Sequence, residues 1–198
     1  TCMVSGGSCE CVPMPPLPLG THGRWADMTQ DGQGTIYVSA YNQTYGDLMV
    51  GTLEGETFSW EFIDGVPTEG DIEGGLDGPR GGVDDSGADV GQHTAIAVDD
   101  QGQLHVFYRD VDNEALKYAR GQLGSGFEIT PLDELGDVGY WTQAVFAGGQ
   151  LHVTYQAPSY EEEGQPPASH VRYRVIDPSA DLATLAGTPG ELVVQGPG

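Results

Sequence analysis

Three copies of one sequence pattern constrain the fold of this chain more than any other feature. Each copy contains a segment in which apolar and polar residues alternate, which predicts a half-buried strand. These segments are 36–41 (IYVSAY), 104–108 (LHVFY) and 151–155 (LHVTY). A turn that contains glycine precedes each segment, and a further strand is predicted before each turn. These earlier strands are predicted at 25–30, 94–98 and 142–146.

Each copy continues with two more predicted strands. They cover 48–51 and 58–63 in the first unit, 116–119 and 127–130 in the second, and 171–174 and 191–194 in the third. Four short antiparallel strands in a unit of about 45 residues are typical of a β-propeller blade. We therefore expect an all-β protein with about three four-stranded antiparallel blades. The predicted blades cover residues 21–66, 91–133 and 138–196 of a domain that spans 21–198. The long final connection, 176–190, has room for one helical turn.

Three blades are too few for a closed ring, because propellers typically contain about four to eight. An unclosed set exposes the apolar faces of its terminal sheets. We expect that oligomerisation completes the ring, with two copies closing six blades, or that another propeller-forming chain supplies the rest. A fragment of a longer chain, or a split propeller, is the alternative.

The charge of the chain argues against several classes of partner. Asp and Glu total 30 while Lys and Arg total 7, which gives a formal net charge of -23. Nucleic acids and anionic membrane surfaces are bound by clustered Lys and Arg, so neither is expected as a partner. No apolar run approaches the roughly 20 residues of a membrane span. With 31 Gly and 13 Pro, the chain is expected to be rich in loops.

The first 20 residues differ from the repeat and form a Cys- and Pro-rich N-terminal segment. It contains all three cysteines, Cys2, Cys9 and Cys11, at a spacing that matches no common zinc site. We expect one disulfide, from Cys2 to Cys9 or Cys11, formed in an oxidising compartment, with one thiol left over. Residues 12–20 (VPMPPLPLG) are predicted to be extended. The cysteines and the acidity favour an extracytoplasmic location, secreted or at the cell surface.

Two insertions interrupt the repeat, and both are expected at one end of the sheets. The acidic, Gly-rich insertion 69–90 separates the first two units, and a shorter one, 158–167, lies within the third. In an antiparallel meander the connections after the second and fourth strands emerge at the same end. This loop face is the expected functional surface. Asp84, Asp85 and Asp89 are candidate Ca2+ ligands, and a solvated acidic loop is the alternative.

The same end of the sheets carries the start of each innermost strand, where aromatic and polar residues gather. Trp25, His93 and Tyr140 are expected at equivalent positions of the three units. Aromatic faces beside hydrogen-bonding groups suit a sugar ring or a peptide. The candidate ligand-binding residues are Arg24, Trp25, His93, Arg109, Asp110, Tyr140 and Trp141. The alternative is that these aromatic side chains only pack blade against blade.

Residues 94–119 (TAIAVDDQGQLHVFYRDVDNEALKYA) resemble the repeats of bacterial secreted β-propellers of the sialidase-like (BNR-type) group. The resemblance extends over the three units and is one of fold. It implies extracellular binding or glycan recognition and, in some members, glycoside hydrolysis. The arginine triad and the Asp-box (S-x-D-x-G-x-T-W) of sialidases have no match here, since 99–106 reads DDQGQLHV. Fold by itself supports function only by analogy.

These observations favour a non-catalytic extracellular protein that binds a glycan or a protein on its loop face, or that builds an assembly. One alternative is a carboxylate-dependent glycoside hydrolase or lyase, which needs two carboxyl groups about 5–10 Å apart. With 30 acidic residues, some pair meets that distance whatever the function. The other alternative is a purely structural subunit of a surface assembly. The motif G-x-S-x-G and a P-loop are absent from the sequence, and no catalytic residue is assigned.

Overall fold

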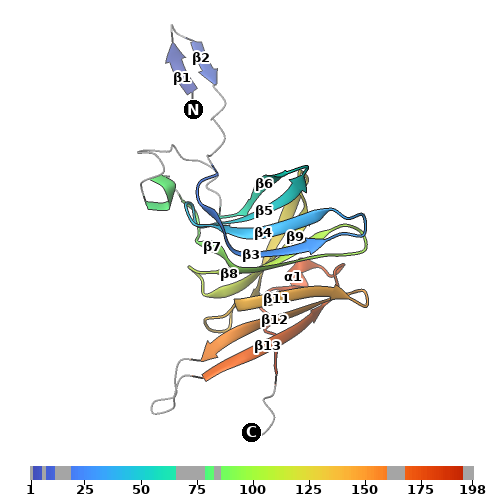
Figure 1. The fold of residues 1–198 in the computed structure, drawn as a ribbon. Coiled ribbons are helices and arrows are strands. Elements are labelled where there is room, and N and C mark those ends of the chain that lie inside the picture. The colour runs from blue at the N-terminus through green and yellow to red at the C-terminus, as the bar shows by residue number, and fades with distance from the viewer. Residues whose placement is uncertain are drawn as a thin grey trace.

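The computed structural model describes residues 2–5, 8–11, 19–65, 79–82, 86–159 and 168–193. These residues form one two-stranded hairpin and three four-stranded antiparallel sheets (Figure 1). The predicted all-β class and the three four-stranded antiparallel units are therefore confirmed. Within the described residues the sheets form no closed barrel or ring, so the propeller arrangement stays a proposal. No helix in this part of the chain is long and apolar enough to span a membrane.

Each four-stranded sheet is a simple meander, in which neighbouring strands follow one another along the chain. The first sheet contains β3 (His22–Gln30), β4 (Ile36–Asn42), β5 (Asp47–Glu54) and β6 (Thr57–Asp64). The second contains β7 (Val90–Val98), β8 (Leu104–Asp110), β9 (Ala115–Gln122) and β10 (Gly126–Asp133). The third contains β11 (Tyr140–Ala147), β12 (Gln150–Ser159), β13 (Ala168–Ile176) and β14 (Glu191–Leu192).

Short elements lie outside these sheets. The one-turn helix α1 (Leu182–Leu185) lies in the final connection, where Asp181 caps it by accepting a hydrogen bond from the amide of Ala183. A 3-10 turn covers Pro79–Gly82. Near the N-terminus, β1 (Cys2–Ser5) pairs with β2 (Ser8–Cys11), and this register sets Cys2 opposite Cys11. The cysteine side chains lie outside what the structure describes, so the disulfide stays a prediction.

The three sheets follow one another through the molecule, with the second in the middle (Figure 1). Their first strands lie next to each other, because β7 contacts β3 on one side and β11 on the other. Successive residues of a strand point to opposite faces, so the second sheet can contribute to two cores. Val106 packs toward Leu48 and Val50 of the first sheet, while its neighbour Phe107 packs toward the third sheet. All residues of β8 are buried as a result.

One polar contact occurs at both interfaces between the sheets. At the first interface, the carboxylate of Asp64 accepts a hydrogen bond from the Tyr108 hydroxyl at 2.7 Å and pairs with Lys117. At the second, Asp133 accepts from the Tyr155 hydroxyl at 2.5 Å and pairs with Arg172 at 2.7 Å. In each case the acid ends the fourth strand of one sheet, and its partners lie on the second and third strands of the next. The contact fixes the position of each sheet against its neighbour.

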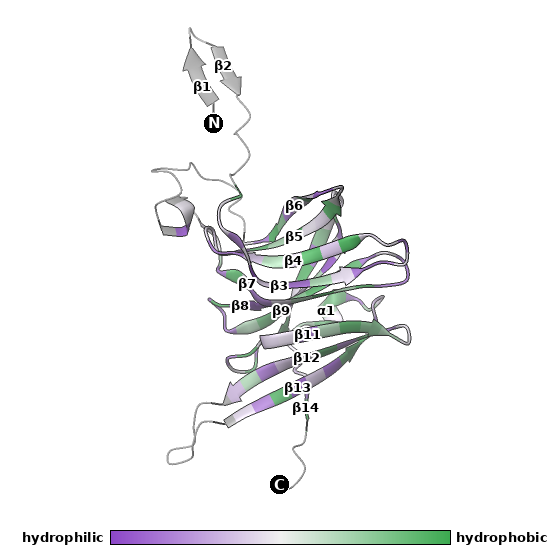
Figure 2. Ribbon diagram, in the orientation of Figure 1, coloured by the Kyte–Doolittle hydropathy of each residue, from purple (hydrophilic) through white to green (hydrophobic). Residues whose placement is uncertain are grey.

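The two outward faces of the set differ. On the first sheet, Trp60 lies directly on Gly51, where its ring leaves no room for a Cβ atom, and Met49 on the same face is fully buried. On the third sheet, Val145, Val171 and Val175 are exposed. Figure 2 shows hydrophobic and hydrophilic residues alternating along β12 and β13. In β12 the apolar residues Leu151 and Val153 are on the buried face, whereas the valines of β13 are on the exposed face. We call the exposed face with these three valines the open face.

Candidate functional site

The first strand of each sheet has the same irregularity near its start. Two consecutive residues of that strand oppose a single residue of the next strand, which is a β-bulge. The bulged pairs are Trp25 and Ala26 opposite Ala40, His93 and Thr94 opposite Tyr108, and Trp141 and Thr142 opposite Tyr155. Because β3, β7 and β11 are neighbours, the three bulges come together.

The first residue of each bulge has a left-handed backbone. The φ angles are 51° for Trp25, 52° for His93 and 50° for Trp141. Bulky residues rarely adopt positive φ, because Cβ then lies too close to the backbone, and each case costs about 1–3 kcal/mol. Such strained residues cluster at functional sites, where the surrounding structure holds them in place. The recurrence of this strain in three sheets therefore marks the bulges as a candidate site.

This geometry corrects one detail of the prediction from sequence. Trp141, and not Tyr140, occupies the position equivalent to Trp25 and His93, while Tyr140 corresponds to Arg24. In each unit a glycine with positive φ lies two residues before the strained residue, and this glycine identifies the equivalent positions. The three glycines are Gly23, Gly91 and Gly139. The shared pattern of glycine, any residue and then a ring-bearing residue is a sequence signal that gives the correct equivalence.

The bulges bring four predicted residues from the three sheets into ring contact. His93 is at the centre, with its ring centroid 4.9 Å from that of Trp25, 4.8 Å from that of Trp141 and 5.3 Å from that of Tyr140. Behind them, the Tyr41 ring contacts Trp25 edge-on at 5.3 Å. We call Trp25, His93, Tyr140 and Trp141 the aromatic cluster.

Two predicted arginines lie on faces of this cluster. The Arg24 guanidinium lies 4.1 Å from the ring centroid of Trp25, and that of Arg109 lies 4.4 Å from the centroid of Tyr140. Arg109 also pairs with Asp137 at 2.6 Å, and Asp137 accepts a hydrogen bond from the Tyr140 hydroxyl at 2.8 Å. Sequence reasoning did not identify Asp137, which lies in the connection between two sheets, although residues 137–142 (DVGYWT) repeat the pattern of residues 89–94 (DVGQHT).

Predicted residue Asp110 has a local role in the structure. Its carboxylate accepts hydrogen bonds from the backbone amide and the side-chain amide of Asn113, both at 3.0 Å, and so closes the turn after β8. Lys117 lies 3.8 Å from the same carboxylate. Asp110 therefore supports the end of the strand that carries Arg109.

A cavity of about 380 Å3 lies at the bulges, lined by the three bulged pairs together with Asp27 and Gln143. Two lining residues already make hydrogen bonds to other protein groups. Thr142 Oγ1 donates a hydrogen bond to the carbonyl of Gly139 at 3.0 Å, and Asp27 Oδ2 accepts one from the amide of Ile96 at 3.0 Å.

Two other lining residues, His93 and Thr94, offer polar atoms that are buried without a hydrogen-bond partner. These atoms are His93 Nδ1 and Thr94 Oγ1, and the residues are only 9% and 4% exposed. Burial, helped by the nearby charges of Arg109 and Arg24, lowers the pKa of His93 to about 4. His93 is therefore a neutral imidazole near pH 7.

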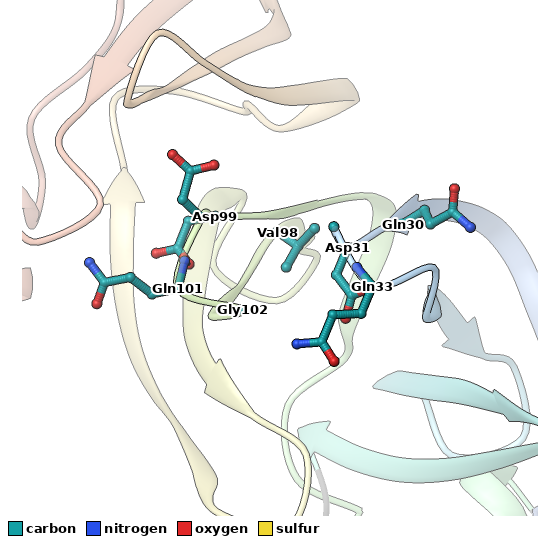
Figure 3. Close-up of a pocket in the computed structure, with 9 residues that line it drawn as sticks. Gln30, Asp31, Gln33, Val98, Asp99, Gln101 and Gly102 are labelled. Carbon is teal, nitrogen blue, oxygen red and sulfur yellow. The ribbon is translucent and has the colours of Figure 1, made fainter.

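A second cavity, of about 370 Å3, lies between the turns that follow β3 and β7, at the other end of these strands (Figure 3). Two of its acidic side chains serve the turns themselves. Asp31 accepts hydrogen bonds from the amides of Gln33 and Thr35, and Asp99 does the same for Gln101 and Gln103. The structure of the turns therefore explains these two carboxylates, whereas the unpaired polar atoms at the bulges have no such explanation.

The predicted Ca2+ ligands fall partly outside the structure. Asp84 and Asp85 lie outside the described residues. The carboxylate of Asp89 accepts a hydrogen bond from the Tyr41 hydroxyl at 2.9 Å and so supports the residue behind Trp25. Among the residues that the structure does describe, no group of three or more His, Cys, Asp or Glu side chains is placed to hold a metal ion.

Comparison with known proteins finds no protein-family model and no curated protein that matches the chain. The site is therefore interpreted from its own geometry.

Proposed function

We propose that this chain is an extracytoplasmic, non-catalytic binding protein of the β-propeller type, which binds a glycan or protein ligand at the aromatic cluster. The observation that carries this proposal is the convergence of three strained bulges on one cavity. Packing alone does not require a left-handed Trp or His at the same position of three strands. Strained residues cluster at binding sites, where rigid side chains are held in a defined orientation.

The propeller arrangement is supported by the way the sheets adjoin. Each sheet is a four-stranded meander whose first strand lies beside the first strand of the next, as innermost strands do in a propeller. The Asp–Tyr–cation contact that recurs at both interfaces supports a regular angular repeat. In this interpretation the aromatic cluster lies where the innermost strands line the axis of the ring.

The open face of the third sheet supports completion of the ring by a second copy or by another propeller-forming chain. Register makes Val171 equivalent to Leu116 of the second sheet. Leu116 is 0% exposed because the third sheet covers it, whereas Val171 is 48% exposed. The open face is therefore built like a face that another sheet covers.

A binding role is favoured over hydrolysis by the state of the nearby acids. Asp27 and Asp137 are the described carboxylates in contact with the cluster or its cavity, and each already accepts hydrogen bonds from protein groups. A glycosidase needs one carboxyl group free to protonate the leaving group. The Ca2+ site proposed at Asp84, Asp85 and Asp89 rests on sequence, and a chelator that lowers the melting temperature would support it.

The experiment that tests the function is a screen of the protein against glycan and peptide arrays, in parallel with the Trp141→Ala variant. Trp141 is 67% exposed, so its removal leaves the cores intact. The matched control is Phe58→Ala, which removes an exposed aromatic ring from the first sheet, away from the cavity. We expect at least one ligand that is bound by the wild type and the control and lost in Trp141→Ala. If every ligand binds the three proteins equally, the proposal is wrong.

A further inference from the structure

We infer that the cavity at the bulges is a subsite for one neutral pyranose ring, which stacks on Trp141 and exchanges hydroxyl hydrogen bonds with His93 Nδ1 and Thr94 Oγ1. This inference rests on the proposed binding function and specifies the class of ligand. Three features of the cavity lead to it: its one accessible aromatic ring, its unpaired polar atoms and its charge.

Trp141 supplies the stacking surface. Its ring is the most exposed of the cluster, and the edge-on contact with His93 holds its orientation. The faces of Trp25 and Tyr140 are each approached by a guanidinium, from Arg24 and Arg109. Trp141 therefore remains as a broad apolar platform beside the cavity, and the apolar face of a pyranose stacks on such a platform.

His93 Nδ1 and Thr94 Oγ1 supply the polar contacts. Both residues are more than nine-tenths buried, both line the cavity, and neither of these atoms has a hydrogen-bond partner. Leaving such groups unpaired costs free energy, which a bound group with its own hydrogen bonds recovers. A sugar hydroxyl both donates and accepts, so it can pair with the threonine hydroxyl and with either tautomer of the imidazole.

The charges around the cavity favour an uncharged ligand. A cation is disfavoured because two guanidiniums already lie on ring faces of the cluster, where a quaternary ammonium group would otherwise bind. An anion is disfavoured because the chain has a net charge of -23 and Arg109 is already paired with Asp137. His93 is neutral near pH 7 and adds no positive charge.

The size of the cavity favours one ring over a peptide. Its volume of about 380 Å3 lies near the lower end of small-molecule sites, which span roughly 300–1,000 Å3. A peptide that binds by adding a strand also requires a strand edge with evenly spaced backbone groups, and the bulges interrupt that edge in β3, β7 and β11.

The test is a titration of the protein with the methyl glycosides of glucose, galactose, mannose and N-acetylglucosamine, one at a time. Binding is monitored through the NMR signals of the tryptophan indole N–H groups. Choline and glucuronate serve as the charged probes. We expect at least one neutral glycoside to bind with a dissociation constant of about 1 mM and to shift the Trp141 signal. Trp141→Ala and the isosteric Thr94→Val should each weaken that binding by about tenfold or more, while Phe58→Ala should leave it unchanged.

The outcomes separate this inference from the proposed function. If choline, glucuronate or an array peptide binds in a Trp141-dependent way and no neutral glycoside does, the inference is overturned and the binding function stands. A neutral glycoside whose affinity is the same in Trp141→Ala and Thr94→Val also overturns the inference, because the sugar then binds elsewhere. If no probe or array ligand depends on Trp141, both are overturned.

Discussion

The imidazole of His93 lies edge-on to the indole of Trp141, with 4.8 Å between the ring centroids, and both residues hold a left-handed backbone with φ of 52° and 50°. They come from neighbouring sheets and occupy equivalent bulge positions. Each strained backbone therefore orients a ring against the other. This relationship connects the stability of the fold to the shape of the site, and four predictions test it and its surroundings.

The backbone strain at Trp141 should determine which of two variants at this position is the more stable. Trp141→Gly and Trp141→Ala lose the same ring contacts, but only glycine adopts positive φ freely. We expect the glycine variant to be more stable than the alanine variant by about 1 kcal/mol in urea denaturation. The control is the same pair of substitutions at Val145, which is exposed on the same strand. There the alanine variant should be more stable than the glycine variant by about 0.5–1 kcal/mol. An alanine variant at 141 that is as stable as the glycine variant would contradict the strain.

The unpaired hydroxyl of Thr94 should be dispensable for stability, unlike that of its equivalent Thr142. Thr94→Val removes a buried oxygen without a partner, and we expect the free energy of unfolding to stay unchanged or to rise by up to about 1 kcal/mol. Thr142→Val removes a hydrogen bond to Gly139 and should cost about 1 kcal/mol. Chemical denaturation of the two variants measures both effects. Equal losses would mean that Thr94 has a partner in solution.

The buried imidazole of His93 should make the protein less stable as the pH falls. Its pKa drops from the ordinary 6.5 to about 4, so below pH 6.5 the unfolded chain takes up a proton that the native state does not. Lowering the pH from 7 to 4 should therefore remove at most about 3 kcal/mol of stability through this group. Denaturation across that range should show His93→Asn losing less stability than the wild type. Parallel pH profiles would rule out the buried neutral imidazole.

The open face of the third sheet should join copies of the chain or a partner. Light scattering of the wild type is expected to give a mass above that of one chain. Val171→Glu places a charge on the open face, and we expect it to shift the mass toward the monomer because burying that charge is unfavourable. Ile129→Glu, at another exposed apolar position on β10, should not. A wild type that stays monomeric would mean that another propeller-forming chain, and not a second copy, covers this face.

Much of the fold could be predicted because its signals are local. Alternation along 104–108 and 151–155 and the glycine turns before them indicated the strands that the structure places in three meanders. His105 and His152, at one repeat position, each contact a tyrosine hydroxyl of the next strand, and His105 also contacts Asp99. At the start of β11 the prediction was wrong about the equivalent residue, Tyr140 instead of Trp141, because an extra residue in a bulge leaves little trace in an alternating pattern.

The sequence by itself determined the number of repeats, the order of strands in each sheet and the presence of aromatic residues at the start of the innermost strands, because short-range periodicity and turn chemistry encode these properties. Only the tertiary structure decided that Asp137 holds Arg109 and that Thr94 lacks the partner that Thr142 has. These properties depend on contacts between sheets that are far apart in the chain. A local pattern cannot record which side chains meet there, or which polar atoms are left without a partner.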